Sequence, residues 1–524
     1  MLIGYPTSGN ACFRNSTPYH AGRMEANLGG QDIWTKAKDF HDQFLVSPQP
    51  IPVPPEGWQT RRCSGWHLAS HPSLPVILLL SPDGNQAGFA IGHPIDDKGR
   101  FVRRDLHLPS VGGASPTPDN LERWIYGFGG RFVFVILLPT MQRLYLDPAG
   151  SLATVWCPRR QRIASTTSLL LLDEPDHPMF RIGPSEFPRN RHDLFYPAGL
   201  TAAAGVRRLI TNHFLDLRTW KATRHYPKTA CMDVAESEIP PLIDTFHQIV
   251  RRQIGALIDE CGGAYLGLTG GQDSRRLLAC ARDFIDRLEC VTVKPKTSVP
   301  GTGKDIDSHI TRRLARHASL RHRFIQMGIA DESSSADYLL RIGYAGGVGK
   351  AGKFWDPPRK HLDLSQAWMI GHCGEVGKAV YWQRLPLKTR PTVENLFRVM
   401  RMPQQPGFAE AIQIWLDGLP EGPPVFYLNM AHLELRVGGW ACAHLYGAAP
   451  FRINLLPVSH RDVIDVLLRL PTEFKAAGGL TREVLKLAWP ELLAIPFNQY
   501  SGLKSWEVRA REWVTRQKKR LLRT

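Results

Sequence analysis

A short apolar run that ends in a glycine pair and continues as a helix constrains this chain more than any other stretch. Residues 265–278 read Tyr-Leu-Gly-Leu-Thr-Gly-Gly-Gln-Asp-Ser-Arg-Arg-Leu-Leu. Gly270 and Gly271 let the backbone approach a ligand closely, because neither residue carries a Cβ. The amides that follow point along the axis of the new helix, where they favour an anion. The stretch therefore predicts a strand, a phosphate-binding loop and a helix.

Three side chains of this loop have chemistry that suits a polyphosphate. Thr269 and Ser274 supply hydroxyl donors, and Asp273 supplies a carboxylate of the kind that holds Mg²⁺ against phosphate oxygens. The spacing matches neither a Walker loop nor the dinucleotide-binding fingerprint. We therefore expect a pyrophosphate cradle of another type. The alternative interpretation is an ordinary strand–turn–helix with two turn glycines.

The string Thr-Gly-Gly-Gln-Asp-Ser at residues 269–274 resembles the S-G-G-x-D-S loop of the ATP pyrophosphatases of the asparagine synthetase type. This resemblance implies an α/β domain of the adenine nucleotide alpha hydrolase-like class with a parallel sheet, and ATP and Mg²⁺ as cofactors. It assigns nucleotide contacts to Leu268, Thr269, Gly270, Gly271, Asp273 and Ser274, with Asp273 as the metal ligand. In the family the backbone of the next strand holds the adenine, which here points to residues 291–293 and to Val293 in particular.

The sequence around the loop predicts alternating helices and strands. We expect helices at residues 240–261, 305–319 and 335–342, and strands at 289–295, 322–326 and 367–371. Such alternation implies right-handed βαβ units and a parallel sheet. Ligands of such sheets bind beyond the carboxyl ends of the strands, where both the loop and the segment after Ile370 fall. We assign residues 239–524 to an asparagine synthetase-like ATP-dependent ligase domain.

That segment, Gly-His-Cys-Gly-Glu-Val-Gly-Lys-Ala-Val-Tyr at residues 371–381, resembles a second motif of the same family, S-G-E-G-x-D-E. The resemblance places Cys373 and Gly374 beside the nucleotide and implies that Glu375 takes a proton from the attacking amine. The family's second Mg²⁺ ligand is replaced by Lys378. Either another residue holds the metal, or Lys378 itself neutralises phosphate charge.

The family also places a lysine near the end of this domain, where it stabilises the oxyanion of an acyl-adenylate. Lys504, in Ser-Gly-Leu-Lys-Ser, is the candidate, and a solvated lysine is the alternative. The basic residues that follow Lys504 are typical of a solvated terminal helix.

Residues 57–228 predict an α+β domain, because short β-type runs alternate with turn signals. The runs at 129–137, 144–150 and 163–166 resemble the glutaminase-like (Ntn-type) amidotransferase domain that precedes asparagine synthetases. In that family the first residue of the mature chain is a cysteine nucleophile, whereas residue 2 here is Leu2 and the first cysteine is Cys12. We therefore expect a degenerate glutamine amidotransferase-like domain. Residues 1–56 are expected to be a flexible N-terminal segment and a proline-rich connector.

Composition sets broader limits. Lys and Arg exceed Asp and Glu by 17 in 524 residues, which favours anionic partners without choosing among them. Nine cysteines without a C-x-x-C spacing argue against zinc ribbons and disulfide frameworks and favour a reducing cytoplasm. The start of the chain has no signal-peptide pattern, and its apolar runs are too short for a membrane span.

If the glutaminase-like domain supplies no ammonia, the ligase domain needs another source of the attacking amine. Lasso-peptide cyclases and β-lactam synthetases of this family close rings with an amine of the same molecule. The patterns at residues 66–76 and 92–96, and Glu375-x-x-Lys378, resemble cyclases of the microcin J25 type. We therefore predict a lasso-peptide macrolactam synthetase, with a precursor peptide as substrate. Its expected partners are a leader peptidase and a leader-recognition protein, with neither nucleic acid nor a membrane.

Three alternatives stay open from the sequence. One is an amide synthetase that uses ammonia on another carboxylate. Another is an RNA-modifying pyrophosphatase, although paired cysteines for its sulfur chemistry are missing. The third is a non-catalytic scaffold that only binds nucleotide.

Overall fold

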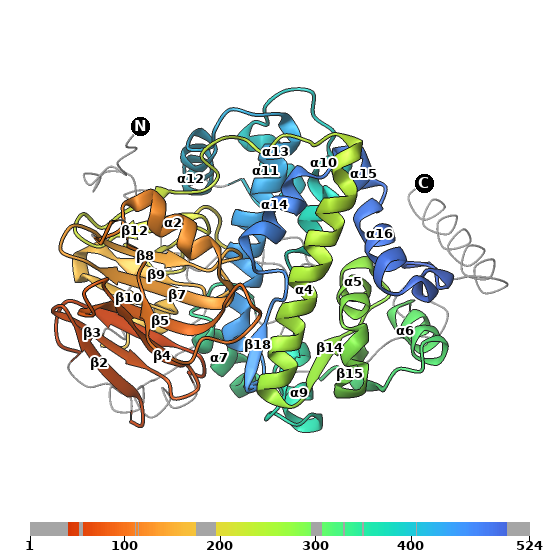
Figure 1. Ribbon diagram of the computed structural model, residues 1–524, viewed down its shortest axis with the longest axis horizontal. Helices are drawn as coiled ribbons and strands as arrows, with labels where there is room; N and C mark the ends of the chain where they lie inside the picture. Colours follow the sequence, from red (N-terminus) through yellow and green to blue (C-terminus); the bar gives the residue numbers. More distant parts are fainter. Residues whose placement is uncertain are drawn as a thin grey trace, which may run out of the picture.

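A computed structural model describes residues 40–51, 56–110, 112–113, 115–173, 195–294, 306–328, 331–347, 351–404 and 406–499. Antiparallel sheets form one side of the molecule (red to yellow in Figure 1), and a mixed helix–sheet part forms the other side (green to blue). The long helix α4 (Ile239–Cys261) links them in the chain and runs through the middle of the view. The architecture is thus mixed, with antiparallel sheets followed by a parallel one.

Two antiparallel sheets build the first part. The six-stranded sheet has the order β11-β9-β10-β1-β3-β2, with β1 (Phe44–Ser47), β2 (Gln59–Cys63), β3 (Trp66–Ser70), β9 (Val155–Cys157), β10 (Arg162–Ala164) and β11 (Arg207–Arg208). The seven-stranded sheet has the order β13-β12-β8-β7-β5-β4-β6, with β4 (Val76–Leu80), β5 (Gln86–Ile95), β6 (Leu106–His107), β7 (Gly129–Leu137), β8 (Gln142–Leu146), β12 (His213–Asp216) and β13 (Lys221–Arg224). Among the described strands of these two sheets, β4 and β6 pair in parallel, and the other neighbours pair antiparallel.

Strand β7 shows how the sequence pattern sets the packing. Its residues are all buried, and alternate side chains enter different cores because a strand has a period of two. Phe132 and Phe134 belong to a cluster with Leu121 of helix α2. Val133 joins the main core of the molecule. The continuous apolar run at this position therefore reflects burial on both faces.

Strand β1 lies earlier in the chain than we expected the first sheet to begin. It pairs antiparallel with both β3 and β10, so it is a central strand. Phe44, Leu45 and Val46 are all buried. The expectation of a flexible segment and connector for residues 1–56 is wrong at residues 44–47, which form this strand. This short apolar run forms a strand because it is buried between the two neighbouring strands β3 and β10.

The second part contains a five-stranded sheet in which all neighbouring strands are parallel. Its order is β16-β15-β14-β17-β18, with β14 (Ala264–Gly267), β15 (Leu288–Lys294), β16 (His322–Gln326), β17 (Ala367–Met369) and β18 (Ile453–Leu455). The predicted strands after the loop are confirmed, and β18 is a strand that we did not predict. The chain winds from β14 to one side and later crosses to β17 on the other side.

Helices surround the sheets, and the predicted helices correspond to α4, α6 and α7. The α-helices besides α4 are α2 (Pro118–Tyr126), α3 (Thr167–Leu170), α5 (Gln272–Cys280), α6 (Ile306–His317), α7 (Glu332–Arg341), α8 (Ala351–Phe354), α9 (Asp356–His361), α10 (Val380–Arg384), α11 (Val393–Met400), α12 (Pro406–Asp417), α13 (Pro424–Met430), α14 (Arg461–Arg469), α15 (Thr472–Ala476) and α16 (Gly479–Ala488). The remaining helical turns are η2 (Pro158–Arg160), η4 (Glu236–Glu238), η5 (Arg282–Arg287), η8 (Gly374–Lys378), the π-helix η9 (Ala431–Ala441), η10 (Ala443–Gly447) and η11 (Pro490–Ala494). Within the described residues, every helix is too short or too polar to cross a bilayer.

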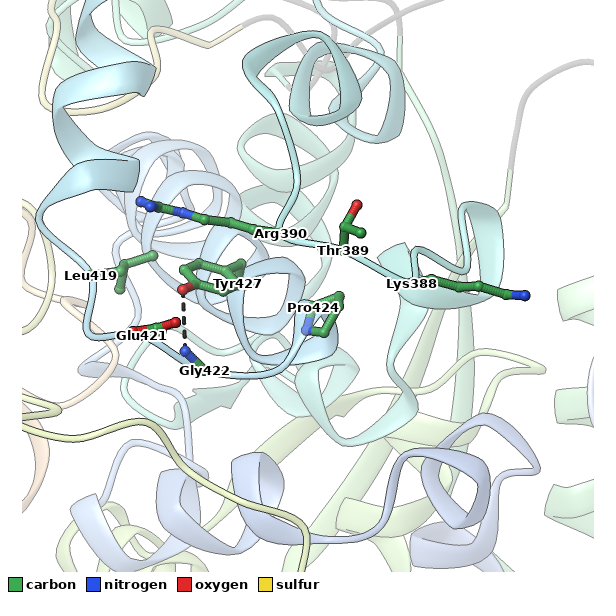
Figure 2. A pocket seen from close by; sticks show the side chains of 8 residues that line it. All are labelled: Lys388, Thr389, Arg390, Leu419, Glu421, Gly422, Pro424 and Tyr427. Atoms are coloured by element: carbon green, nitrogen blue, oxygen red, sulfur yellow. Dashed lines mark hydrogen bonds between the residues drawn. The ribbon is translucent and has the colours of Figure 1, made fainter.

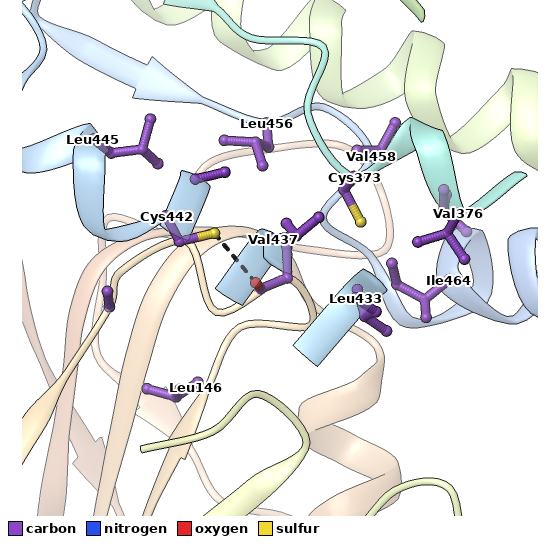
Figure 3. Packing of buried hydrophobic residues seen from close by; sticks show 14 of the residues in the cluster. Leu146, Cys373, Val376, Leu433, Val437, Cys442, Leu445, Leu456, Val458 and Ile464 are labelled. Carbon is purple, nitrogen blue, oxygen red and sulfur yellow. Dashed lines mark hydrogen bonds between the residues drawn. The ribbon is translucent and has the colours of Figure 1, made fainter. Parts of the chain in front are cut away.

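The two parts share one continuous core and a buried polar contact. Glu434 of η9 accepts hydrogen bonds from Arg224 of β13, from the Asn212 side chain at 2.8 Å and from Trp415 Nε1 at 2.6 Å. Leu146 of the antiparallel part lies in the same apolar cluster as residues of η8 and η9 (Figure 3). This interface holds the segment after β17 in place.

Candidate functional site

The candidate site lies where the winding of the parallel sheet changes direction. Strand β14 has β15 on one side and β17 on the other. The glycine-rich loop follows β14, and the 371–378 segment follows β17, so both leave the carboxyl ends of adjacent strands. Ligands of open parallel sheets bind at such switch points. The structure thus brings together two sequence motifs that lie about a hundred residues apart.

The amides of the loop are bonded within the chain. The Thr269 N–H donates to Ser274 Oγ at 3.0 Å, and the Gly271 N–H donates to Thr269 Oγ1 at 3.3 Å. The Gly270 N–H donates to Oδ1 of Asp307, the second residue of α6, at 2.7 Å. The Asp307 carboxylate therefore accepts a hydrogen bond from the Gly270 amide, one of the amides that we expected to bind phosphate.

The need for glycine at residue 270 arises from this packing. A Cβ at this position would lie 3.2 Å from Asp307 Oδ1, 3.2 Å from Asn498 Oδ1 and 3.3 Å from Ile310 Cβ. Those distances are tighter than ordinary contacts, so any side chain would push the neighbours apart. We had attributed the glycine to close approach of a ligand, and the chain's own neighbours already require it.

Asp273 is bound by two cationic side chains. Its Oδ1 accepts a hydrogen bond from Arg276 Nη2 at 2.8 Å, and its Oδ2 accepts one from Lys378 Nζ. The Asp273 and Lys378 side chains retain 19% and 20% of their exposure, whereas Arg276 retains only 2%. The pair Asp273–Lys378 therefore faces solvent, and Arg276 supports it from inside.

Arg276 ties the two motifs together. The same Nη2 that contacts Asp273 also donates to the carbonyl oxygen of Gly374 at 2.9 Å. Nη1 donates to Thr481 Oγ1 of α16 at 3.1 Å. A Cβ at residue 374 would lie 2.3 Å from Nη2 of Arg276, so a side chain there would displace this guanidinium from its present contacts. Arg276 thus fixes the loop helix, the 371–378 segment and α16 relative to one another.

The described residues do not fit a Mg²⁺ site of the kind that the sequence predicted. Both oxygens of Asp273 accept hydrogen bonds from cations, and one of these cations is Lys378. Within the described residues, no group of three or more His, Cys, Asp or Glu side chains is placed to hold a metal ion. Positive charge at this position comes from Lys378 and Arg276 instead.

Glu375 is turned toward histidines. Its Oε1 lies 3.7 Å from His372 Nδ1, which is longer than a hydrogen bond. Its Oε2 is buried, and no donor of the described residues lies within hydrogen-bonding distance of it, although 26% of the side chain is exposed. Burial alone would raise the pKa of this carboxyl, but His372, His432 and Lys378 outweigh it and hold the pKa below its usual range. Glu375 is therefore ionised and has an unused acceptor.

His432 of η9 completes this cluster, and no local sequence pattern singles it out. Burial lowers its pKa to about 4, against the opposing charge of Glu375, so the ring is neutral at pH 7. Tyr381 packs edge-on against the ring at 4.8 Å between centroids. In the structure, His432 lies in an eleven-residue π-helix, and π-helical turns are frequent at functional sites.

Cys373 points away from the predicted nucleotide. Its thiol is fully buried among apolar residues of η8, η9 and α14 (Figure 3). Burial raises its pKa well above the usual range, so the thiol stays protonated. The backbone φ of +78° places Cys373 in the left-handed region, which is strained for a non-glycine residue. We had expected Cys373 beside the nucleotide, and the structure assigns its side chain to the core.

Val293 presents backbone groups beside the loop. The Val291 carbonyl accepts a hydrogen bond from the Leu268 N–H at 2.8 Å, on the β14 side of β15. Alternate residues of a strand direct their N–H and C=O groups to the same edge. Val293 therefore directs its groups to this edge, beyond the last β14 pair at Gly267↔Val291. Leu268 itself is buried, and its carbonyl accepts from the Thr292 hydroxyl at 2.9 Å.

The end of the described chain closes over the loop. Arg275 is buried and donates hydrogen bonds to carbonyls of residues 492–496, and its guanidinium lies 4.1 Å from the Phe497 ring centroid. The Asn498 N–H donates to the Gly270 carbonyl at 2.9 Å. The predicted Lys504 lies outside the described residues.

Comparison of the chain with models of known protein families and with curated proteins finds no match. The functional assignment therefore depends on the residues and geometry of the site.

Two hollows lie in this part of the molecule. An apolar one of about 30 Å³, enough for one water molecule, adjoins His372 and is lined by Trp368, Ile370 and Phe451, among others. Another of about 480 Å³ lies among the helices between β17 and β18, beside Lys388, Arg390 and Tyr427 (Figure 2). The larger hollow includes no residue of the loop or of the 371–378 segment, so it is separate from the candidate site.

Sequence reasoning did not single out three other residues of the site. Arg276 follows Asp273 by three residues, so helical spacing places both on one face. Asp307 lies in the first turn of α6, the helix after β15. Because β15 and β14 are parallel neighbours, the first turn of α6 lies near the carboxyl end of β14. Asn498 has no local signal, because only the tertiary fold brings it to Gly270.

Proposed function

We propose that this chain is an AMP-forming, ATP-dependent carbon–nitrogen ligase that closes a macrolactam ring in a lasso-type precursor peptide. The observation that carries the proposal is the joining of the two motifs through Asp273, Arg276, Gly374 and Lys378 at the sheet's switch point. The first part of the chain is proposed to be a degenerate glutaminase-like scaffold of the Ntn type, and the second an ATP pyrophosphatase domain.

In the proposed reaction, a carboxylate side chain of the peptide attacks the α-phosphorus of ATP and pyrophosphate leaves. The loop amides and the positive groups of Lys378 and Arg276 stabilise the leaving charge. The backbone edge at Val293 accommodates the adenine. The peptide's own N-terminal amine then attacks the acyl-adenylate, and AMP leaves.

Glu375 is proposed to receive the attacking amine. A carboxylate with a depressed pKa is a weak proton acceptor, so its main contribution is to orient the free amine, whose N–H donates to the partly exposed carboxylate. The proton released when the amide bond forms passes to solvent. Holding the amine and the acyl group together makes ring closure effectively unimolecular, which can lower a barrier by roughly 7–11 kcal/mol when the geometry is right.

The test is mass spectrometry of a candidate precursor incubated with ATP, the leader peptidase and this protein. The expected product is lighter by one water and resists aminopeptidase. Its formation should fall in Asp273→Asn, because Asp273 holds the Lys378 and Arg276 donors in place. The loss of one such donor commonly costs on the order of 10²–10³-fold in rate. The matched control is Asp363→Asn. This residue lies on the loop before β17, at the amino ends of the parallel strands and thus away from the site. A product that gains ammonia's nitrogen and keeps a free N-terminus would instead support an amide synthetase.

A second candidate is a scaffold that binds nucleotide without catalysis. The observation that favours it is that Asp273 and the loop amides are already bonded within the chain. Carboxylate-dependent release of pyrophosphate from ATP would contradict this candidate.

A further inference from the structure

The amide of Gly270 is bonded to an anion that belongs to the chain itself. Asp307 lies in the first turn of α6, which follows β15, the neighbour of β14. Its Oδ1 accepts the Gly270 N–H at 2.7 Å, a short distance typical of a charged acceptor. The Thr311 hydroxyl donates to the Asp307 backbone carbonyl at 2.8 Å and stabilises this first turn.

A half-buried lysine feels the charge of the same carboxylate. Burial lowers the pKa of Lys353, in α8, and the negative charge of Asp307 opposes that effect. Asp307 therefore interacts with both a loop amide and an ammonium group. If the amide were taken by another anion, Lys353 would still offer Asp307 a favourable electrostatic partner.

We propose that Asp307 is a positioning residue that holds the phosphate-binding loop through the Gly270 amide and is displaced when pyrophosphate or the polyphosphate of ATP binds there. This inference rests on the proposed function, since it assumes that the loop is an anion site. Two anions at one amide repel each other, and a single N–H makes one strong hydrogen bond at a time. Asp307 therefore competes with the phosphate, which lowers affinity while keeping the empty loop ordered.

The test is direct binding of inorganic pyrophosphate, measured by titration calorimetry on the full chain. Asp307→Ala removes the competing acceptor and should bind pyrophosphate about tenfold more tightly than the wild type, because hydrogen bonds to charged groups are the stronger ones. Asp307→Asn keeps an acceptor for Gly270 but loses the charge, so its affinity should rise by less. Circular dichroism checks that each variant is folded.

The matched control is Asp286→Asn, which removes one negative charge from an exposed residue in η5, before β15 and thus at the opposite edge of the sheet. It should bind pyrophosphate like the wild type. An equal gain in this control would show that only net charge matters and would overturn the proposal.

Weaker or unchanged pyrophosphate binding in both Asp307 variants would also overturn the proposal. If the Asp307 carboxylate competes with pyrophosphate for the Gly270 amide, its removal must raise the affinity for pyrophosphate. If neither the wild type nor the variants bind pyrophosphate, the loop is no anion site, and the inference and the proposed function both fail. If the Asp307 variants gain affinity but no carboxylate substrate drives AMP formation, only the ligase proposal fails.

Discussion

Lys378 donates a hydrogen bond to Oδ2 of Asp273, so a lysine neutralises the carboxylate that was expected to bind a metal. The two residues belong to different motifs, after β14 and after β17, and both side chains are partly exposed. The proposed phosphate site therefore carries a cation of its own. We therefore expect Asp273 to position Lys378 and not to hold a metal, and we expect Lys378 to donate to the phosphate.

Lys378→Met should slow substrate-dependent AMP formation on the order of 10²–10³-fold, because the leaving pyrophosphate would lose a positively charged donor. The measurement is AMP release at saturating ATP. Lys486→Met, at an exposed ion pair on α16, is the control and should retain the wild-type rate. A wild-type rate in Lys378→Met would mean that Lys378 serves only to neutralise Asp273 in the empty site.

The chain should not hydrolyse glutamine. A glutaminase of this kind needs a cysteine whose own backbone amine acts as base. The cysteines that the structure describes in the first part, Cys63 and Cys157, lie within the chain and are buried. The measurement is glutamate release from glutamine in the presence of ATP. Cys12 lies outside the described residues, and turnover that disappears in Cys12→Ala would revive a processed, active glutaminase.

Acid should destabilise the first part of the chain through His93 of β5. Burial lowers its pKa to about 3, despite the opposing charge of Asp42, whereas the pKa of a histidine in the unfolded chain is about 6.5. The unfolded state therefore binds more protons between these pH values, and stability falls as pH decreases through this window. At pH 5 the loss from this one group is about 2 kcal/mol relative to pH 8.

The prediction is checked by urea unfolding at pH 8 and pH 5. His93→Gln should reduce the difference in unfolding free energy between the two pH values, whatever its effect on absolute stability. His107→Gln removes an exposed imidazole and serves as control. An unchanged pH dependence in His93→Gln would contradict the assignment of acid sensitivity to this ring.

The buried carboxylate of Glu434 should matter more than a surface ion pair. Glu434→Ala removes the carboxylate that pairs with Arg224 and accepts from Asn212, and breaking a buried pair in this way costs on the order of 3–5 kcal/mol. Asp417→Ala breaks the exposed pair with Arg390 and should cost less than about 1 kcal/mol. Equal losses in urea unfolding would show that Glu434 does not stabilise the interface.

Local patterns in the sequence determined most of the elements around the site. Strand β16 and helix α6 follow from apolar periodicity and turn residues, which act over a few neighbouring positions. Alternation of strands and helices was enough to predict a parallel sheet and to place both motifs at its carboxyl edge. Strand β1 escaped this reasoning, because four residues carry too little periodicity and its order comes from pairing with β3 and β10.

What only the tertiary structure decided is where each polar group of the site points. The sequence placed Cys373 and Glu375 in one motif, yet packing against η9 turns the thiol into the core and leaves the carboxylate among histidines. The Asp307 carboxylate reaches Gly270 because β14 and β15 are neighbours in the sheet. Hydrogen bonds and burial act between groups that are close in space, and strand order, which no local pattern encodes, sets that closeness.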